Sequence, residues 1–233
     1  MGVVDGTDFL DWADAVMPKA AQQGLRVVFI SPYSPQPVDP VAYAVQCATV
    51  HQRYAAYDPV WEIWNEPNLA QYWGAPPSVN DYVKLAVATA TKLRVSGASQ
   101  VWSGGTSGID VRWSYAMLQQ GAFEVMNGCA VHSYKDPGAA SADYVALQKL
   151  LPPNFPIHTT ETCVPSSQDQ SAFLEGMWYI HRALGLPTLI WCELRDFTAG
   201  LNPPYNYPYG MLWSTYNPKP VYYTAKSLTS TCD

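Results

Sequence analysis

The sequence predicts an α/β fold in which short parallel strands alternate with helices along the chain. Short apolar runs recur throughout, and the segments between them carry apolar residues at helical spacing. Chains with this alternation form repeated β/α units around a parallel sheet. No internal linker, low-complexity tract or short repeat interrupts the pattern, so we expect a single domain over residues 1–233.

The pattern begins with a helix and a strand. Phe9, Trp12 and Val16 recur at helical spacing, and Gly24 is a natural end for that helix. The apolar run 25–30 then predicts a buried strand. By the same criteria we expect strands at 60–65, 100–105, 129–134, 157–161 and 188–194, and helices at 40–56, 79–95, 112–125, 141–151, 168–184 and 220–229. The expected sheet therefore has about six strands, whereas a complete (β/α)8 barrel has eight.

Composition excludes several classes of partner. The net charge is -6 and only 14% of residues are charged, so nothing favours binding to nucleic acid or to an anionic membrane. No apolar run approaches the roughly 20 residues of a membrane helix. No basic start followed by an apolar stretch marks a signal peptide, so we expect a protein that is cytoplasmic or secreted after processing.

The five cysteines show no CxxC spacing, which argues against a zinc site. We expect buried free thiols. Cys163 and Cys192 fall on neighbouring expected strands, but strand alternation points them to different faces and argues against a disulfide between them.

Two glutamates carry most of the functional signal. Glu66 lies in residues 61–68 (WEIWNEPN) and Glu161 in residues 156–162 (PIHTTET), each where an apolar strand gives way to a polar loop. Two carboxylates at matching ends of parallel strands are the equipment for cleaving a glycosidic bond, one as acid/base and one as nucleophile. The alternatives are a strand-end Glu66 that caps its loop and an exposed loop acid at Glu161.

Two further ionisable residues near this pair, Glu62 and His158, are expected to have no part in the chemistry. Glu62 lies four residues before Glu66 on the same strand face, and we expect it to accept a structural hydrogen bond, because burying a second reactive acid would be costly. His158 and Glu161 are three residues apart, which places them on opposite faces of a strand. We therefore expect no metal site from this pair, and cleavage by two carboxylates needs neither a metal nor an organic cofactor.

Other candidate site residues lie at the ends of the later strands. His132 and Tyr134 share a face, where Tyr134 is placed to donate to the nucleophile and His132 to bind a sugar hydroxyl; the alternative is a buried pair without a functional role. Trp191 and Glu193 share a face at the end of the last strand. The indole of Trp191 is either an apolar platform for a sugar ring or part of the core.

Two expected loops are rich in aromatic residues. One is 69–74 (LAQYWG), which contains Trp73, and the other runs from 197 to 213 and contains Tyr205, Tyr207 and Tyr209. Aromatic loops at the mouth of a parallel barrel suit stacking against sugar rings. The alternative is a lid packed on itself. The sequence has no Walker loop, no GxGxxG after a strand and no GxSxG.

Together these segments resemble the clan A glycoside hydrolases, a large (β/α)8 superfamily. Residues 61–68 resemble the fourth-strand acid/base motif, with wording closest to glycoside hydrolase family 39. Residues 131–134 resemble the sixth-strand segment, residues 158–161 the seventh-strand nucleophile motif, and Trp191 the eighth-strand aromatic. The resemblance covers about residues 7–228.

The resemblance implies specific roles for three residues. Glu66 would be the acid/base, Glu161 the nucleophile, and Asn65 the side chain that holds the 2-hydroxyl of the sugar. The expected activity is that of a retaining β-glycoside hydrolase acting on a polysaccharide or oligosaccharide, with carboxyl groups about 5–5.5 Å apart. The alternatives are an inactive carbohydrate-binding pseudoenzyme and, from another class, a lyase with one glutamate as base. Neither the sugar nor its linkage is predicted.

The resemblance fails at the front of the chain. The expected strands match strands 3 to 8 of a TIM-type (β/α)8 barrel, so the first two strands, and the arginine that the family places on the second, have no counterpart. An incomplete barrel leaves two sheet edges unpaired. The chain is then a fragment or shortened product, part of a homo-oligomer whose second copy covers the open edges, or a smaller barrel with rearranged edges.

Overall fold

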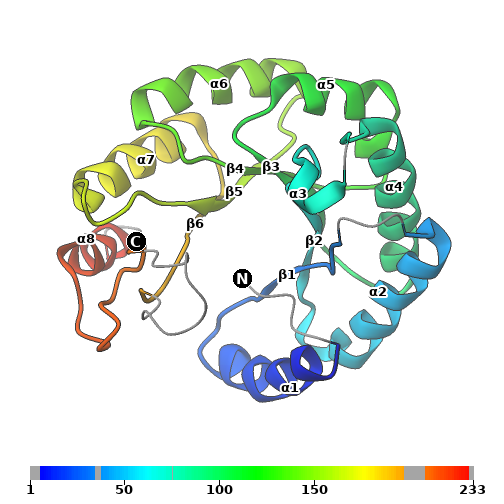
Figure 1. Cartoon of the computed structure of the whole chain (residues 1–233), viewed down its shortest axis with the longest axis horizontal. Helices are drawn as coiled ribbons and strands as arrows, with labels where there is room; N and C mark the ends of the chain where they lie inside the picture. Colours follow the sequence, from blue (N-terminus) through cyan, green and yellow to red (C-terminus); the bar gives the residue numbers. More distant parts are fainter. Residues whose placement is uncertain (1–5, 35–37, 75, 197–207, 231–233) are drawn as a thin grey trace.

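The computed structural model describes residues 6–34, 38–74, 76–196 and 208–230. Within them six parallel strands form one sheet, in which each strand pairs with the next one in the sequence. The sheet curls, and the helices form an outer ring that is open between α1 and α8 (Figure 1). The expected incomplete TIM-type barrel is therefore confirmed.

The six strands overlap the predicted ranges, but three are shorter: 28–30 instead of 25–30, 129–132 instead of 129–134, and 188–191 instead of 188–194. They are β1 (Val28–Ile30), β2 (Val60–Asn65), β3 (Val101–Ser107), β4 (Cys129–His132), β5 (Ile157–Thr162) and β6 (Thr188–Trp191). The helices are α1 (Gly6–Gln22), α2 (Pro40–Tyr54), α3 (Ala70–Trp73), α4 (Val79–Val95), α5 (Val111–Gln119), α6 (Pro137–Leu150), α7 (Gln170–Leu184) and α8 (Pro220–Thr229). Two short 3-10 turns, η1 (Ala55–Tyr57) and η2 (Ala122–Glu124), follow α2 and α5.

The largest differences from the expected helices have local causes. Helix α6 begins at Pro137 rather than at 141, because Asp136 caps it by accepting from the Gly138 N–H and proline is favoured in a first turn. Helix α5 ends at Gln119, before Gly121, whose φ of 72° is left-handed. The short helix α3 lies within the aromatic loop 69–74 and was not expected.

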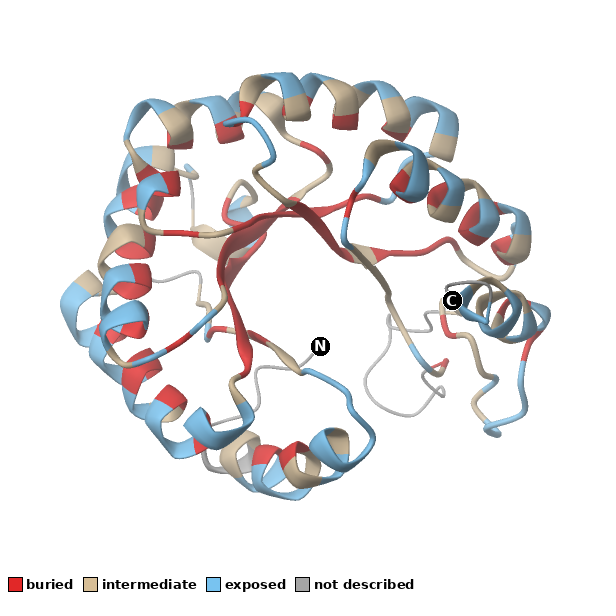
Figure 2. Cartoon of the chain, turned by 180° about the vertical axis from the view of Figure 1, so that it is seen from behind, coloured by how far each residue is buried: buried red, intermediate tan, exposed pale blue. Residues whose placement is uncertain are grey.

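Apolar side chains fill both sides of the sheet. The larger cluster lies between the strands and the helices, whose inward faces are buried (Figure 2). A smaller cluster contains Val60, Trp102 and Ala130. His158 stacks on Trp102 with ring centroids 3.6 Å apart, and burial lowers the pKa of His158 to about 4, so the imidazole is neutral.

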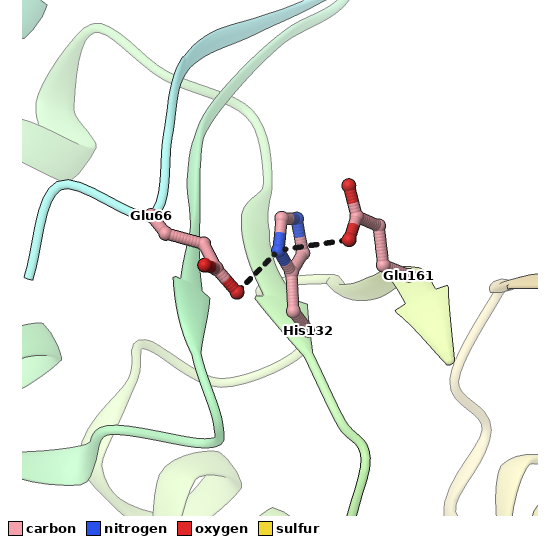
Figure 3. Close-up of side chains that lie close together, drawn as sticks. All are labelled: Glu66, His132 and Glu161. Carbon is pink, nitrogen blue, oxygen red and sulfur yellow. Dashed lines mark hydrogen bonds and ion pairs between the residues drawn. The ribbon is translucent and has the colours of Figure 1, made fainter. Parts of the chain in front are cut away.

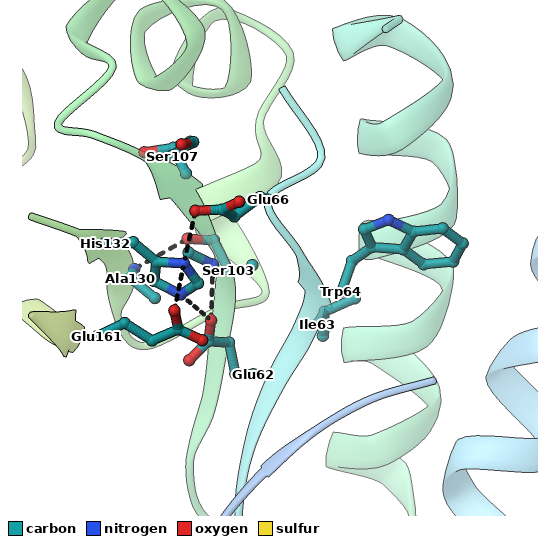
Figure 4. Close-up of polar contacts among 12 residues, drawn as sticks. Glu62, Ile63, Trp64, Glu66, Ser103, Ser107, Ala130, His132 and Glu161 are labelled. Atoms are coloured by element: carbon teal, nitrogen blue, oxygen red, sulfur yellow. Dashed lines mark hydrogen bonds and ion pairs between the residues drawn. The ribbon is translucent and has the colours of Figure 1, made fainter. Parts of the chain in front are cut away.

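Two irregularities interrupt strand alternation close to the expected site. Trp64 has a φ of 75°, its N–H donates to the Ser31 hydroxyl, and its ring is directed away from Glu62 and Glu66 (Figure 4). In β5 the pairing register shifts between Thr159 and Thr162, which places Glu161 directly opposite His132. The strict alternation assumed for this strand is therefore wrong at its end.

A buried ion pair holds the segment that follows β6. Lys219 is 1% exposed, and its ammonium donates to Asp196 Oδ1 at 2.7 Å. The same oxygen accepts from the Gly210 N–H at 2.8 Å. The chain entering α8 is thereby tied to the end of the sheet, next to the Tyr209 carbonyl that accepts from the Trp191 indole.

The four cysteines that the structure describes, Cys47, Cys129, Cys163 and Cys192, are free thiols, as expected, and the first three are buried. Cys232 lies outside the described residues. The helices of the described part of the chain are all too short or too polar to cross a membrane.

Candidate active site

The end of β2 presents one of the expected site residues, Glu66, in an uncommon backbone conformation. Glu66 has a φ of 42°, which is left-handed and rare for a residue with a side chain. Its N–H donates to the Gly105 carbonyl at 3.0 Å, so pairing with β3 continues through this position. Non-glycine residues held in this region cost about 1–3 kcal/mol each and gather at functional sites.

One imidazole lies between the two expected catalytic glutamates. His132, at the end of β4, is 0% exposed. Its Nδ1 lies 3.1 Å from Glu66 Oε1 and 3.5 Å from Glu161 Oε2 (Figure 3). Its other nitrogen, Nε2, lies 3.3 Å from Glu62 Oε1. Residues from β2, β4 and β5 are thereby brought together around a single ring.

The surrounding carboxylates determine the charge of this imidazole. Burial by itself would lower the pKa of His132, but hydrogen bonds to Glu62 and Glu66 and the charge of Glu161 outweigh burial and raise the pKa to about 10. His132 is therefore protonated at neutral pH. Among the described residues it is the only basic side chain that pairs with Glu62, Glu66 or Glu161.

Glu161 has one hydrogen-bond donor, Tyr134, and one ion-pair partner, His132. The Tyr134 hydroxyl donates to Glu161 Oε2 at 2.6 Å, as the shared strand face predicted. Burial raises the pKa of Glu161, and the charges of Glu62 and Glu66 add to this effect, whereas His132 and the Tyr134 hydrogen bond oppose it. The carboxyl of Glu161 therefore ionises at a higher pH than an exposed glutamate does.

The two glutamates approach each other closely. One carboxylate oxygen of Glu66, one of Glu161 and a ring nitrogen of His132 all lie within 4.8 Å of one another. This spacing suits a retaining glycosidase and is shorter than the roughly 6.5–9.5 Å of inverting enzymes. Three such atoms are also enough to hold a metal ion, but a protonated His132 is a donor and not a ligand. The absence of a metal from the function remains a prediction.

Three further expected residues lie at or just beyond the carboxyl ends of β2 and β6. Asn65 is 6% exposed, and its side chain makes no hydrogen bond to any residue that the structure describes, so its amide is unused by the protein there. Burial raises the pKa of Glu193, and the charges of Asp196 and Glu161 contribute, which places Glu193 within electrostatic reach of the site. Trp191 is partly buried, with its ring edge-on to Phe173.

Two residues that were expected to contact the sugar, His132 and Trp73, contact other parts of the protein instead. His132 has no exposed surface and both its nitrogens face carboxylates, so it holds the glutamates and does not meet a sugar hydroxyl. The ring of Trp73 packs edge-on between Trp64 and Tyr82, at centroid distances of 5.0 and 5.8 Å. It therefore packs against the core, which agrees with the alternative of a loop packed on the protein itself. Tyr205 and Tyr207 of the second aromatic loop lie outside the described residues.

Sequence reasoning missed two tyrosines that face the glutamates. Tyr33 follows β1, and its ring lies edge-on to Tyr72, 5.5 Å away. Burial raises the pKa of both phenols, that of Tyr72 to about 12, and the charges of Glu66 and Glu161 contribute in each case. The available signal was position, because Tyr33 follows a strand at the same end of the sheet as Glu66.

A pocket of about 220 Å³ adjoins the site on the side of β5. Neither Glu66 nor Glu161 lines this pocket, but Tyr134 both lines it and donates to Glu161. Its other lining residues are Asp136, Cys163, Val164, Pro165, Gln168, Phe173 and Tyr209.

Comparison with known proteins gives likeness in structure alone. No protein-family model matches the chain, and no curated protein matches it in sequence. A GH39 enzyme from Xanthomonas axonopodis pv. citri superposes with a TM-score of 0.74 at 18% identity, covering 98% of this chain and 55% of that one. A monomeric beta-xylosidase from Caulobacter crescentus CB15 gives 0.74 at 16% identity, covering 97% and 56%. A family 39 glycoside hydrolase from Bacteroides cellulosilyticus WH2 gives 0.77 at 17% identity, covering 99% and 55%.

Almost the whole of this chain is matched, but it spans only slightly more than half the length of these solved structures. The resemblance to family 39 glycoside hydrolases that the motifs indicated is confirmed at the level of the fold. Sequence identities this low show the shared fold and do not assign an activity or a substrate to this chain.

The two neighbouring aromatics of α3 should respond differently to truncation. Trp73→Ala should lower the free energy of unfolding by up to about 3 kcal/mol, because the ring packs against Trp64 and Tyr82. Tyr72→Ala should cost less stability, because its ring packs edge-on against Tyr33 outside the core cluster. Urea denaturation of the two variants measures the difference. A Trp73→Ala protein with unchanged stability would show that the Trp73 ring does not support the core.

Proposed function

We propose that this protein is a retaining β-glycoside hydrolase that cleaves a β-linked polysaccharide or oligosaccharide by double displacement. The observation that carries the proposal is the approach of Glu66 and Glu161, with one carboxylate oxygen of each within 4.8 Å of the other. Glu66 follows β2 and Glu161 lies at the end of β5, in a sheet whose fold is shared with family 39 glycosidases. Active sites of this barrel type lie at the carboxyl ends of the strands, as these residues do.

In the first step the Glu161 carboxylate attacks the anomeric carbon, and the bond from that carbon to the leaving oxygen breaks. Glu66 gives its proton to the leaving oxygen, so a glycosyl ester on Glu161 and a free alcohol result. In the second step Glu66 takes a proton from water, the resulting hydroxide attacks the anomeric carbon, and Glu161 leaves as a carboxylate. Two inversions retain the anomeric configuration.

The surroundings support these roles. Tyr134 donates to Glu161 and the imidazolium of His132 lies beside it, and both favour the ionised form that attacks. The unused amide of Asn65 is the proposed partner of the sugar 2-hydroxyl. Trp191 and Glu193 are proposed to border the sugar at the end of β6, and we add Tyr33 and Tyr72 as aromatic neighbours of the bound ring.

The proposed reaction needs no metal and no organic cofactor, because protons and the leaving group move between two carboxylates and water. The substrate class is a β-glycan. Since one solved structure of similar fold is titled a beta-xylosidase, β-xylosides are the first substrates to test.

A carbohydrate-binding pseudoenzyme is the second candidate. The unpaired edges of β1 and β6 favour it, because the wall of the barrel between them has no strand in the described residues. The hydrogen bond from Tyr134 and the ion pair with His132 favour the enzyme, since a disused nucleophile has no need of either.

Removing either carboxylate should greatly reduce turnover. We expect Glu66→Gln to lower kcat/KM by about 10²–10⁴-fold, the usual contribution of a general acid/base, and Glu161→Gln to leave no measurable activity. The assay is release of aryl alcohol from a panel of aryl β-glycosides and of reducing ends from soluble β-glycans, with chelator present. Sodium azide should restore cleavage in Glu66→Ala, giving a β-glycosyl azide, and in Glu161→Ala, giving an α-glycosyl azide.

Glu175→Gln, on the exposed face of α7, is the matched control and should keep full activity. A wild-type protein that binds glycans without cleaving them would favour the pseudoenzyme. Loss of activity on chelation, or inversion of the anomeric proton signal in NMR, would contradict the two-carboxylate retaining mechanism.

Tyr134 should set the acidic limb of the pH profile. Activity rises with pH as Glu161 loses its proton, so its raised pKa places this limb above that of an ordinary glutamate. Tyr134→Phe removes a donor to the carboxylate, raises the pKa of Glu161 further, and should move the limb to higher pH while kcat/KM falls about 10–100-fold. Tyr179→Phe, 64% exposed on α7, is the control. An unmoved limb in Tyr134→Phe would mean that another group governs it.

We also propose that a second copy of the chain covers the open barrel edges. Each edge strand pairs on one side only, and large apolar side chains beside the opening are exposed, Trp12 at 48% and Leu194 at 67%. Light scattering should give twice the chain mass at micromolar concentration, and Leu194→Asp should halve it. Val95→Asp, 79% exposed on α4, should have no effect. A wild-type monomer would rule out the homodimer.

A further inference from the structure

A third carboxylate lies beneath Glu66 and Glu161 and has no part in the proposed reaction. Glu62, on β2, is 0% exposed. Its Oε1 accepts from the Gly105 N–H at 2.8 Å, the structural hydrogen bond expected for it, and lies 3.3 Å from His132 Nε2 (Figure 4). Its Oε2 has no hydrogen-bond partner among the residues that the structure describes. A buried carboxylate is costly, so its retention here requires a reason.

The reason lies in the proton count of His132. A neutral imidazole carries one N–H, whereas an imidazolium carries two. Carboxylate oxygens face both ring nitrogens, with Glu62 on the Nε2 side and Glu66 and Glu161 on the Nδ1 side. Only the doubly protonated ring donates in both directions, and only with Glu62 present does the Nε2 proton have an acceptor.

Strand β3 is shaped to admit this contact. A Cβ at position 105 would lie 2.1 Å from His132 Nε2 and 2.8 Å from Glu62 Oε1. Any residue other than glycine would therefore push the ring and the carboxylate apart. Glycine at 105 also brings its N–H to Glu62, so the same residue gives space and a donor.

We propose that Glu62 is a positioning residue that acts through His132, holding a doubly protonated imidazole under Glu66 and Glu161 so that Glu161 is ionised for attack. Glu62 is fully buried and touches no substrate. The catalytic part of this proposal rests on the proposed function, whereas the contact between Glu62 and His132 does not.

The other titratable groups facing this pair stay uncharged at neutral pH. Tyr82 from α4 and Cys129 on β4 face Glu62, and burial raises the pKa of both, that of Cys129 to about 11. On the far side His132 faces only Glu66 and Glu161 among the described residues. The charge on the imidazole is therefore set by three carboxylates, of which Glu62 is the one fully enclosed by the fold.

The experiment is a titration of the histidine imidazoles by NMR in protein labelled with ¹⁵N-histidine, with the His132 signals assigned by their loss in His132→Gln. In the wild type both nitrogens of His132 should remain protonated to at least pH 9. In Glu62→Gln the ring should lose a proton at lower pH, because its first acceptor is neutral. Glu175→Gln makes the same change in net charge on an exposed face and should leave His132 unchanged.

Kinetics give the second readout. Glu62→Gln should lower kcat more than it changes KM and should move the acidic limb to higher pH, which a merely structural defect would not do. A wild-type His132 that titrates near the ordinary value of about 6.5 would overturn the proposal, and this test needs no variant to fold. Identical titrations in wild type and Glu62→Gln would overturn it as well. If the NMR result holds but no glycan is cleaved, the proposed function fails and the catalytic role with it, while the contact stands.

Discussion

The arrangement of the candidate site depends on one electrostatic constraint, a single imidazolium that lies among three clustered carboxyl groups and offsets part of their negative charge. Glu62, Glu66 and Glu161 come from two different strands, and repulsion between them would separate the strand ends or keep the acids protonated. His132 lies among all three and donates in both directions. The bulge in β5 that puts Glu161 opposite His132 can be understood as a local adjustment to this contact.

The strands and the two glutamates were predictable because they depend on local patterns. The apolar runs located all six strands of the described sheet, and the spacing of Glu62 and Glu66 placed both on one face. The left-handed conformation of Trp64 was not predictable, since it is set by Ser31 and by packing against distant rings. The position of Trp73 was missed for the same reason: which of two adjacent aromatics in a loop faces the core depends on tertiary contacts.

The incomplete barrel affects the parts of the site unequally. Glu66, His132 and Glu161 lie at the ends of β2, β4 and β5, each of which has neighbours on both sides. Tyr33 follows β1 and Glu193 follows β6, the two strands that lack a neighbour on one side. The reacting groups are thus supported by paired strands, while the residues that would contact the outer parts of a sugar stand at the open edges.

The order of the strands bears on how the molecule assembles. Because every strand pairs with the next one in the sequence, each new β/α unit can add to a surface that the preceding chain has already formed. Contacts between segments close in sequence cost little loop entropy and favour fast folding. On a ribosome the imidazole and its three carboxylates could therefore meet once β5 has emerged, before α7, β6 and α8 are made. The later elements are then added to a cluster in which the imidazolium already offsets part of the negative charge.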